Sequence, residues 1–176
     1  MKIPHLEVRR NFPPPGRDKF RDYYNRVLSQ FPFGQQYVET TYGQTFILTA
    51  GRESNPPVIL LHGSCSNSAF WFPEIMALSN DYRVYAFDII GEAGNSEEYR
   101  PDIDSDAFAM RLDMPVLFID GEDDVIIDVR GSVKRLSSLI PSAEVQLLTD
   151  CGHVVANSID YIVRFLMKRQ VDVGVL

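Results

Sequence analysis

Four short runs of apolar residues, each ending in a polar loop, dominate the pattern of this chain. The runs lie at Val58–Leu61, where two of the four residues are β-branched, and at Val84–Asp88, Val116–Ile119 and Val145–Leu148. Runs of this length are typical of strands that a parallel sheet buries on both faces. Because the loops after such strands lie along the carboxyl edge of the sheet, we expect any ligand site there.

In most of the segments between and around these runs, apolar residues recur at the three- and four-residue spacing of a helix face. It predicts helices at residues 18–31, 67–79, 107–110, 130–140 and 159–168. The inner face of the second helix is predicted to hold Phe70, Ile75, Met76 and Leu78. Before the first run, β-rich segments within Tyr37–Thr49 predict an antiparallel hairpin at one sheet edge. Strands alternating with helices predict an α/β fold with a mostly parallel sheet and helices on both faces.

This organisation predicts one domain overall. Residues 1–34 would form an N-terminal arm and an amphipathic helix. Residues 35–109 would be the N-terminal half of the core, and residues 110–176 its C-terminal half. A chain of this length is able to bury a substantial core.

Charge and composition disfavour several classes of partner. The 24 acidic and 17 basic residues give a net charge of -7, which argues against nucleic acid and anionic membrane surfaces. No signal-like segment opens the sequence, and no apolar run approaches the roughly 18 residues of a membrane span. Cys65 and Cys151 lie far apart, and no Cys/His cluster has zinc spacing. We therefore expect reduced thiols, a cytoplasmic location and neither a metal nor another cofactor.

Three of the polar loops carry residues with catalytic chemistry. His62-Gly63-Ser64-Cys65 follows the first run, Gly121–Asp124 the third, and Gly152-His153 the fourth. In this order the loops resemble the oxyanion loop, the acid turn and the histidine loop of the α/β-hydrolase family. The amphipathic helix ahead of the hairpin makes the resemblance strongest to bacterial carboxylesterase-like members. The resemblance implies a three-layer fold and ancestry among ester or amide hydrolases.

The resemblance also implies a role for each loop. Asp124 would orient the imidazole of His153 and stabilise its protonated form, and His153 would be the general base. The backbone N–H of Ser64, within the loop His62–Cys65, would be one oxyanion donor.

The residues themselves leave other interpretations open. Asp123 is an alternative acid, and Asp124 also suits a helix cap. His153 could bond only to the backbone of its loop, and His62 suits a structural role. The acidic residues from Asp120 to Asp128 lack the spacing of a calcium loop, so a solvated turn explains them better.

The loop after the second run, Asp88–Ser96, resembles the family's Asp-x-x-Gly…Gly-x-Ser loop, with one extra residue between the glycines. Its glycines permit a sharp turn beside the site. Asp88 is therefore predicted to anchor this loop rather than to act as a catalyst.

The nucleophile of the α/β-hydrolase family is missing from this sequence. That family carries it in Gly-x-Ser-x-Gly, on a sharp turn between a strand and a helix. Gly63-Ser64 lacks the final glycine and follows the wrong strand, and Gly131-Ser132 lies inside a predicted helix. Relative to the family, the chain skips at least two βα units near residues 108–111. The sheet should therefore lack central strands, and the identity of the nucleophile is unknown.

Two explanations fit this skip. Either the polypeptide lacks the segment, or the sequence omits residues that the polypeptide contains. An intact mass equal to that of the 176 residues would support the first explanation.

Together these features predict a truncated serine-hydrolase relative that has no esterase turnover as written. Its substrate would be a small-molecule ester or amide only if the missing segment is present. The alternative is a non-catalytic scaffold or binding protein that kept the outer strands of the fold. Sheet edges left open by the missing strands would favour homo-oligomers.

Overall fold

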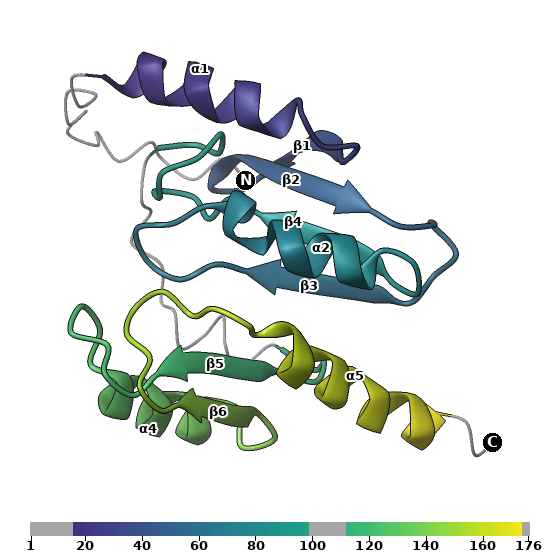
Figure 1. Cartoon of the computed structure of the whole chain (residues 1–176), viewed down its shortest axis with the longest axis vertical. Coiled ribbons are helices and arrows are strands. Elements are labelled where there is room, and N and C mark those ends of the chain that lie inside the picture. The colour runs from purple at the N-terminus through teal and green to yellow at the C-terminus, as the bar shows by residue number, and fades with distance from the viewer. Residues whose placement is uncertain (1–15, 99–111, 174–176) are drawn as a thin grey trace. The chain divides into compact units, whose positions relative to one another are not determined.

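The computed structural model describes residues 16–98 and 112–173, which belong to two compact units. The N-terminal unit is Met1–Arg100 and the C-terminal unit is Pro101–Leu176 (Figure 1). The helix predicted at 107–110 and the position of the skip at 108–111 lie outside the described residues.

The N-terminal unit contains a four-stranded sheet in the order β1-β2-β4-β3. β1 (Gly34–Thr40) and β2 (Gly43–Ala50) form an antiparallel hairpin, which confirms the predicted hairpin and its place at a sheet edge. β2 also pairs antiparallel with β4 (Arg83–Phe87), and β4 pairs in parallel with β3 (Pro57–Leu61). Because β3 and β4 are parallel, the loops that follow them begin at the same edge of the sheet.

Within residues 16–98, three helical segments accompany this sheet. α1 (Arg17–Leu28) precedes the hairpin, as its helical spacing predicts. η1 (Ser68–Trp71), a turn of 3₁₀ helix, leads directly into α2 (Phe72–Leu78), and Figure 1 shows α2 lying over the sheet. Asn67 caps η1, because its side-chain oxygen accepts the Ala69 N–H at 3.1 Å.

Burial on both faces, predicted for the first apolar run, is wrong for β3. Val58 and Leu60 are buried, whereas Ile59 and Leu61 are 46% and 52% exposed. Successive side chains of a strand point to opposite faces, and β3 is the last strand of its sheet. Within the described residues, only one face of β3 is therefore packed.

The inner face predicted for the second helix is also only half right. Ile75 and Leu78 are buried, but Phe70 and Met76 are exposed. Phe70 lies in η1, whose three residues per turn put it out of phase with α2. Met76 follows Ile75 by one position, about 100° around α2, and so points away from the buried face.

The described part of the C-terminal unit, residues 112–173, contains two strands and two helices. β5 (Leu117–Gly121) pairs in parallel with β6 (Glu144–Leu148), and these are the third and fourth predicted runs. α4 (Val129–Leu139) lies between them in the chain, and α5 (Ile159–Val173) follows β6. The last residues of the two strands are register partners, so the loops after β5 and β6 begin side by side.

All four predicted runs are therefore strands, and they form two parallel pairs connected through helices. This arrangement is an α/β fold, with the antiparallel hairpin at one edge of the first sheet. In the described ranges, no helix is both long enough and apolar enough to cross a membrane.

Candidate active site

The predicted site residues divide between the two units. Asp124 and His153 lie in the C-terminal unit, in the loops after β5 and β6. The loop His62–Cys65 lies in the N-terminal unit, directly after β3. The structure therefore brings Asp124 and His153 together within the C-terminal unit, whereas the loop His62–Cys65 belongs to the N-terminal unit.

Asp124 and His153 form a close pair across 29 residues of sequence. The Nδ1 atom of His153 lies 2.8 Å from Oδ2 of Asp124, and the Asp124 side chain is fully buried while that of His153 is 18% exposed. Because a carboxylate oxygen accepts, Nδ1 carries the proton of this bond. The neutral ring then has its lone pair on Nε2, which is the nitrogen that a general base of this kind uses.

The second oxygen of Asp124 fixes the turn that carries it. Oδ1 accepts the backbone N–H of Ile126 at 2.7 Å and that of Ile127 at 3.1 Å. Capping and pairing with His153 are therefore compatible, since each uses a different oxygen. Asp123, the alternative acid, is exposed at this turn, whereas the side chain of Asp124 holds the bond to His153.

Hydrogen bonds keep the Asp124 carboxyl ionised. Desolvation by burial raises its pKa, but the bonds from His153 and from the Ile126 and Ile127 amides outweigh that effect and hold the pKa below its ordinary value. A negative charge in contact with the imidazole stabilises the protonated ring, which is the electrostatic role of an acid in a catalytic triad.

Backbone contacts lock the acid turn against the histidine loop. The Glu122 N–H donates to the Leu148 carbonyl at 2.9 Å, and the Asp123 N–H donates to the Cys151 carbonyl at 3.0 Å. At Gly121, an added Cβ would collide with the carbonyl oxygens of Cys151 and its neighbour Gly152. Only glycine allows this close approach, so the spacing between Asp124 and His153 depends on it.

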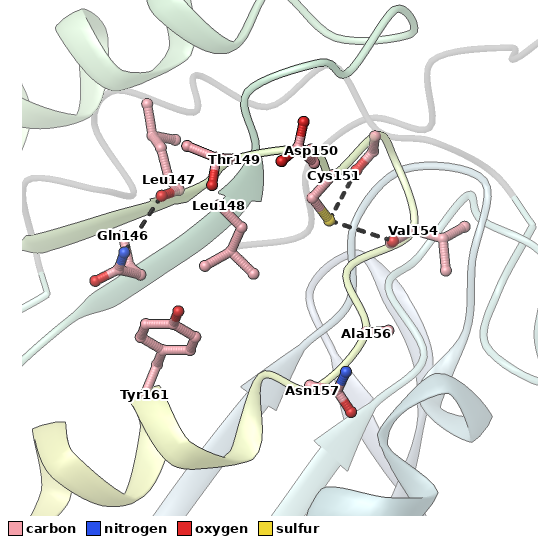
Figure 2. Close-up of a pocket in the computed structure, with 11 residues that line it drawn as sticks. Gln146, Leu147, Leu148, Thr149, Asp150, Cys151, Val154, Ala156, Asn157 and Tyr161 are labelled. Atoms are coloured by element: carbon pink, nitrogen blue, oxygen red, sulfur yellow. Dashed lines mark hydrogen bonds between the residues drawn. The ribbon is translucent and has the colours of Figure 1, made fainter.

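A pocket of about 700 Å³ lies beside the histidine loop (Figure 2). Its lining includes Tyr161 of α5 and the segment from Gln146 to Gly152. Asp150 and Asn157, which also line it, adopt left-handed backbone conformations with φ of 54° and 62°. The Cys151 thiol donates to backbone carbonyls of the same loop. These features give the loop around His153 a defined and partly strained shape.

His62 ties the loop after β3 to the loop after β4. It is 5% exposed; its Nε2 accepts the Ile89 N–H at 3.0 Å, and its Nδ1 lies 2.7 Å from the Gly63 carbonyl oxygen. Since Nε2 accepts, Nδ1 carries the proton and donates to that carbonyl. Both ring nitrogens of His62 therefore form hydrogen bonds with backbone groups, one in each of the two loops.

Sequence analysis missed Glu92, which occupies the predicted oxyanion loop. The Cys65 N–H donates to Oε2 of Glu92 at 3.0 Å, and the Ser64 hydroxyl donates to Oε1 at 3.5 Å. Cys65 has a φ of 59°, an unusual conformation for a residue other than glycine. An acidic residue between two glycines of the loop after β4 was the available signal. The carboxylate of Glu92 thus occupies the backbone N–H of Cys65 in this loop.

Asp88 is the structural anchor that the sequence predicts. Its side chain is 1% exposed. Oδ1 accepts the Ser68 N–H at 2.8 Å and the Tyr24 hydroxyl at 2.9 Å, and Oδ2 accepts the Asn95 N–H at 2.7 Å. Burial, and then the charge of Asp88, raise the pKa of the Tyr24 hydroxyl, so this group remains a donor. Asp88 therefore joins α1, η1 and its own loop.

α1 adds further bonds to the loop after β4. Arg21 donates from Nε to the Gly94 carbonyl at 3.2 Å and from Nη2 to the Ser96 carbonyl at 3.0 Å. The Asn95 side-chain amide donates to Oδ1 of Asn25 at 2.7 Å. The amphipathic helix thus supports the loop that carries Glu92.

Among residues 16–98 and 112–173, no three His, Cys, Asp or Glu side chains converge as a metal site. Within the acidic turn, the carboxylates of Asp120, Asp124 and Asp128 accept backbone N–H groups, and that of Asp124 also binds His153.

Comparison with known proteins finds relatives for part of the chain. No protein-family model matches it. It is 40% identical over 80 residues to the uncharacterized carboxylesterase Nap of Bacillus subtilis, and 41% identical over 80 residues to carboxylesterase YbfK of the same organism. Each match takes in 44% of this chain but only 27% of the relative, so the chain spans about a quarter of the curated relatives it matches.

Solved structures agree in fold over a longer stretch. The carboxylesterase CesB (YbfK) of Bacillus subtilis has a TM-score of 0.61 with 18% identity, covering 87% of this chain and 97% of that one. The naproxen esterase of Bacillus subtilis has a TM-score of 0.63 with 19% identity, covering 86% and 97%. A putative lipase of Acinetobacter baumannii scores 0.62 with 13% identity, covering 87% and 97%.

These likenesses and the strand–loop arrangement define the class: the chain has the α/β-hydrolase fold. Within that class, its sequence resembles bacterial carboxylesterases, over a length that fits a truncated member.

Proposed function

We propose that this chain is a carboxylesterase-like hydrolase scaffold that keeps the acid–base half of a catalytic site and lacks the nucleophile. The carrying observation is the 2.8 Å bond between Asp124 and His153 in a chain without a Gly-x-Ser-x-Gly turn. Its relatives' names support an ancestral substrate of small-molecule ester type and a bacterial origin.

In this proposal the acid and the base keep their usual roles. Asp124 holds the imidazole of His153 in the Nδ1–H tautomer and stabilises its protonated form. His153 would take a proton from a nucleophile through Nε2 and return it to the leaving group. The loop His62–Cys65 would contribute backbone donors to the developing oxyanion.

Without the nucleophile turn, these groups have no hydroxyl or thiol placed for attack. The second oxyanion donor is lost with it, since it normally comes from the residue after the nucleophile. Ser64, Cys65 and Ser66 are poor substitutes, because attack from this loop would displace the loop's own donor. The Cys65 N–H is moreover engaged by Glu92. The chain as written should therefore show no esterase turnover above background.

A turnover assay tests this proposal. Short-chain nitrophenyl esters and a fluorophosphonate label would be applied to protein whose intact mass matches the 176 residues. We expect neither steady turnover nor labelling. A burst of product that disappears in His153→Ala would contradict the proposal. If Cys65→Ala also abolished that burst, Cys65 would be an improvised nucleophile.

A second candidate is a non-catalytic scaffold that assembles through its sheet edges. β3 is the last strand of its sheet, and its Ile59 and Leu61 side chains are exposed. β5, in the two-stranded sheet, has β6 as its partner on one side. Open edges favour pairing with another chain, so we propose homo-oligomers. Light scattering after size-exclusion chromatography tests this, and a strictly monomeric chain at high concentration would contradict it.

A further inference from the structure

A pair of donors in the loop after β3 holds the carboxylate of Glu92. Oε2 of Glu92 accepts the Cys65 N–H at 3.0 Å, and Oε1 lies 3.5 Å from the Ser64 hydroxyl oxygen. Each oxygen of one carboxylate therefore meets its own donor, and such two-point contacts give carboxylate recognition its geometry. The oxyanion donor proposed for this loop is the Ser64 backbone N–H, so the pair that binds Glu92 consists of different groups.

The two donors lie where a ligand from solution has access. Cys65 is exposed and Ser64 is half-buried. At Gly63, an added Cβ would meet no atom within 4 Å, so there is open space beside the turn. Cys65 also has a left-handed φ of 59°, a conformation that residues other than glycine rarely adopt, in the arrangement that meets Glu92. Among the described residues, the turn therefore has room for a small anion.

Other bonds fix the positions of both loops. His62 accepts the Ile89 N–H at 3.0 Å and so ties the loop after β3 to the loop after β4. In the loop after β4, the Gly91 N–H donates to the Glu97 carbonyl at 2.9 Å, and the Glu92 N–H donates to the Ile89 carbonyl at 3.0 Å. None of these bonds uses the side chain of residue 92. Removing its carboxylate should therefore empty the pair of donors and leave both loops in place.

We propose that the Cys65 N–H and the Ser64 hydroxyl form a binding site for small carboxylates, and that Glu92 is its built-in competitor. A carboxylate tethered to the neighbouring loop has a high effective concentration, so it keeps free carboxylates out of the wild-type chain. When that side chain is absent or withdrawn, a free carboxylate binds the same two donors. The inference deepens the proposed function and rests on it for the ligand class, since a carboxylate is the acid product of ester hydrolysis.

The two cysteines of the chain allow the site to be read by NMR without any enzyme activity. With ¹⁵N-labelled cysteine, the 176-residue chain gives two amide signals, from Cys65 and Cys151, and Cys151→Ser tells them apart. Sodium formate and sodium acetate are the probes, and sodium chloride at equal concentration controls for ionic strength. In the wild-type chain we expect no response of the Cys65 signal beyond that to chloride, because Glu92 fills the site.

Glu92→Ala should open the site. The Cys65 signal should move upfield, because its N–H loses a charged acceptor, and formate or acetate should return it toward the wild-type position along a saturable curve. The Cys151 amide lies in the other unit and should not respond to formate, so it is the internal reference. Glu53→Ala, at an exposed position of the N-terminal unit, is the matched control and should behave as wild type.

Glu92→Asp keeps the test decisive if Glu92→Ala fails to fold. Its carboxylate is one methylene shorter and no longer reaches the Cys65 N–H, so formate should again give a saturable shift. A Cys65 signal that responds to formate no more than to chloride in the folded variants would overturn the proposal. So would an equal saturable response in wild type, since Glu92 would then not compete. Neither result alters the expected absence of esterase turnover, so the two proposals fail separately.

Discussion

The loops after β3 and β5 both follow the carboxyl end of a parallel strand, yet they use their polar groups differently. After β5, Asp124 divides its two oxygens between its own turn and the imidazole of His153. After β3, the backbone N–H of Cys65 is bound by the carboxylate of Glu92. The carboxylate of the loop after β5 binds an imidazole, whereas a backbone N–H of the loop after β3 is bound by a carboxylate of the same unit.

This difference shows what remains when the nucleophile segment is absent. The acid–base pair is built from two adjacent strands of one unit, so it needs no other part of the fold. The oxyanion loop has a polar backbone that requires an acceptor in any case, and Glu92 supplies one. In each unit, contacts within the unit itself therefore satisfy the polar groups of the loop.

The largest effect should come from Asp88→Ala, which removes the support beneath the N-terminal loops. The Ser68 and Asn95 amides and the Tyr24 hydroxyl would each lose a buried acceptor. We expect a loss of about 3 kcal/mol or more in the free energy of unfolding. Urea denaturation followed through the fluorescence of the single tryptophan, which lies in η1, measures it.

Asp81→Ala is the control for this variant, since Asp81 is exposed and precedes the same strand. It should change stability by about 0.5 kcal/mol at most. Equal losses in the two variants would contradict the role of Asp88 as the anchor.

Gly121→Ala should have the next largest effect, this time on the acid–base side. The added methyl group would push against the Cys151 and Gly152 carbonyls, at a cost of about 1 to 3 kcal/mol. Gly63→Ala is the matched change in the oxyanion loop, where a Cβ meets no atom within 4 Å, and should cost much less. Urea denaturation followed by circular dichroism compares them. Equal costs would mean that the contact between the acid turn and the histidine loop does not constrain the chain.

Asp124→Asn should weaken the C-terminal unit in a pH-dependent way. The folded-state pKa of Asp124 lies below the ordinary 3.8, so its ionised form stabilises the fold above that value and the contribution is lost as the pH falls through the folded pKa. The variant should therefore be less stable than wild type at pH 7, and the gap should close below about pH 3.8. Asp123→Asn, at an exposed position, should show no such closing gap. Denaturation curves measured from pH 7 to below pH 3.8 give this difference in stability. A difference between wild type and Asp124→Asn that stays constant with pH would contradict the stabilising role of the ionised Asp124 carboxylate.

Much of the fold followed from periodicity, because local patterns determine where strands and helices form. All four apolar runs are strands, and the hairpin within Tyr37–Thr49 is present. The burial of individual side chains was predicted less well from the sequence, since it depends on which elements pack against a strand or helix, and a local pattern does not specify them. The run Val58–Leu61 has the sequence of a strand packed on both faces, but Ile59 and Leu61, which share one face of β3, are exposed.

The candidate site was predictable where chemistry and spacing coincide. Asp124 and His153 follow consecutive parallel strands, so topology alone brings them near each other. The choice between Asp123 and Asp124 was not predictable, because it depends on which carboxylate turns back to bind the Ile126 and Ile127 amides. Glu92 was missed for a similar reason, since its role arises only when two loops from different strands meet.

The smallest effect should come from Glu92, and it tests the other half of the comparison. Replacing it by alanine removes a charged acceptor from the Cys65 N–H in a partly exposed loop, so we expect a loss of only about 0.5 to 1 kcal/mol in stability. The local effect should be clearer. Hydrogen exchange of the Cys65 amide should become faster in Glu92→Ala, and Glu92→Gln should fall between that variant and wild type because its amide oxygen still accepts.

Glu53→Ala, at an exposed position of the same unit, is the matched control and should leave the Cys65 amide unchanged. If the Cys65 amide exchanged at the wild-type rate in Glu92→Ala, the carboxylate would not be its acceptor in solution. The loop after β3 would then have its donor available to an outside anion, as an oxyanion loop requires. The contrast with the loop after β5 would disappear, because both loops would be ready for chemistry and only the nucleophile would be missing.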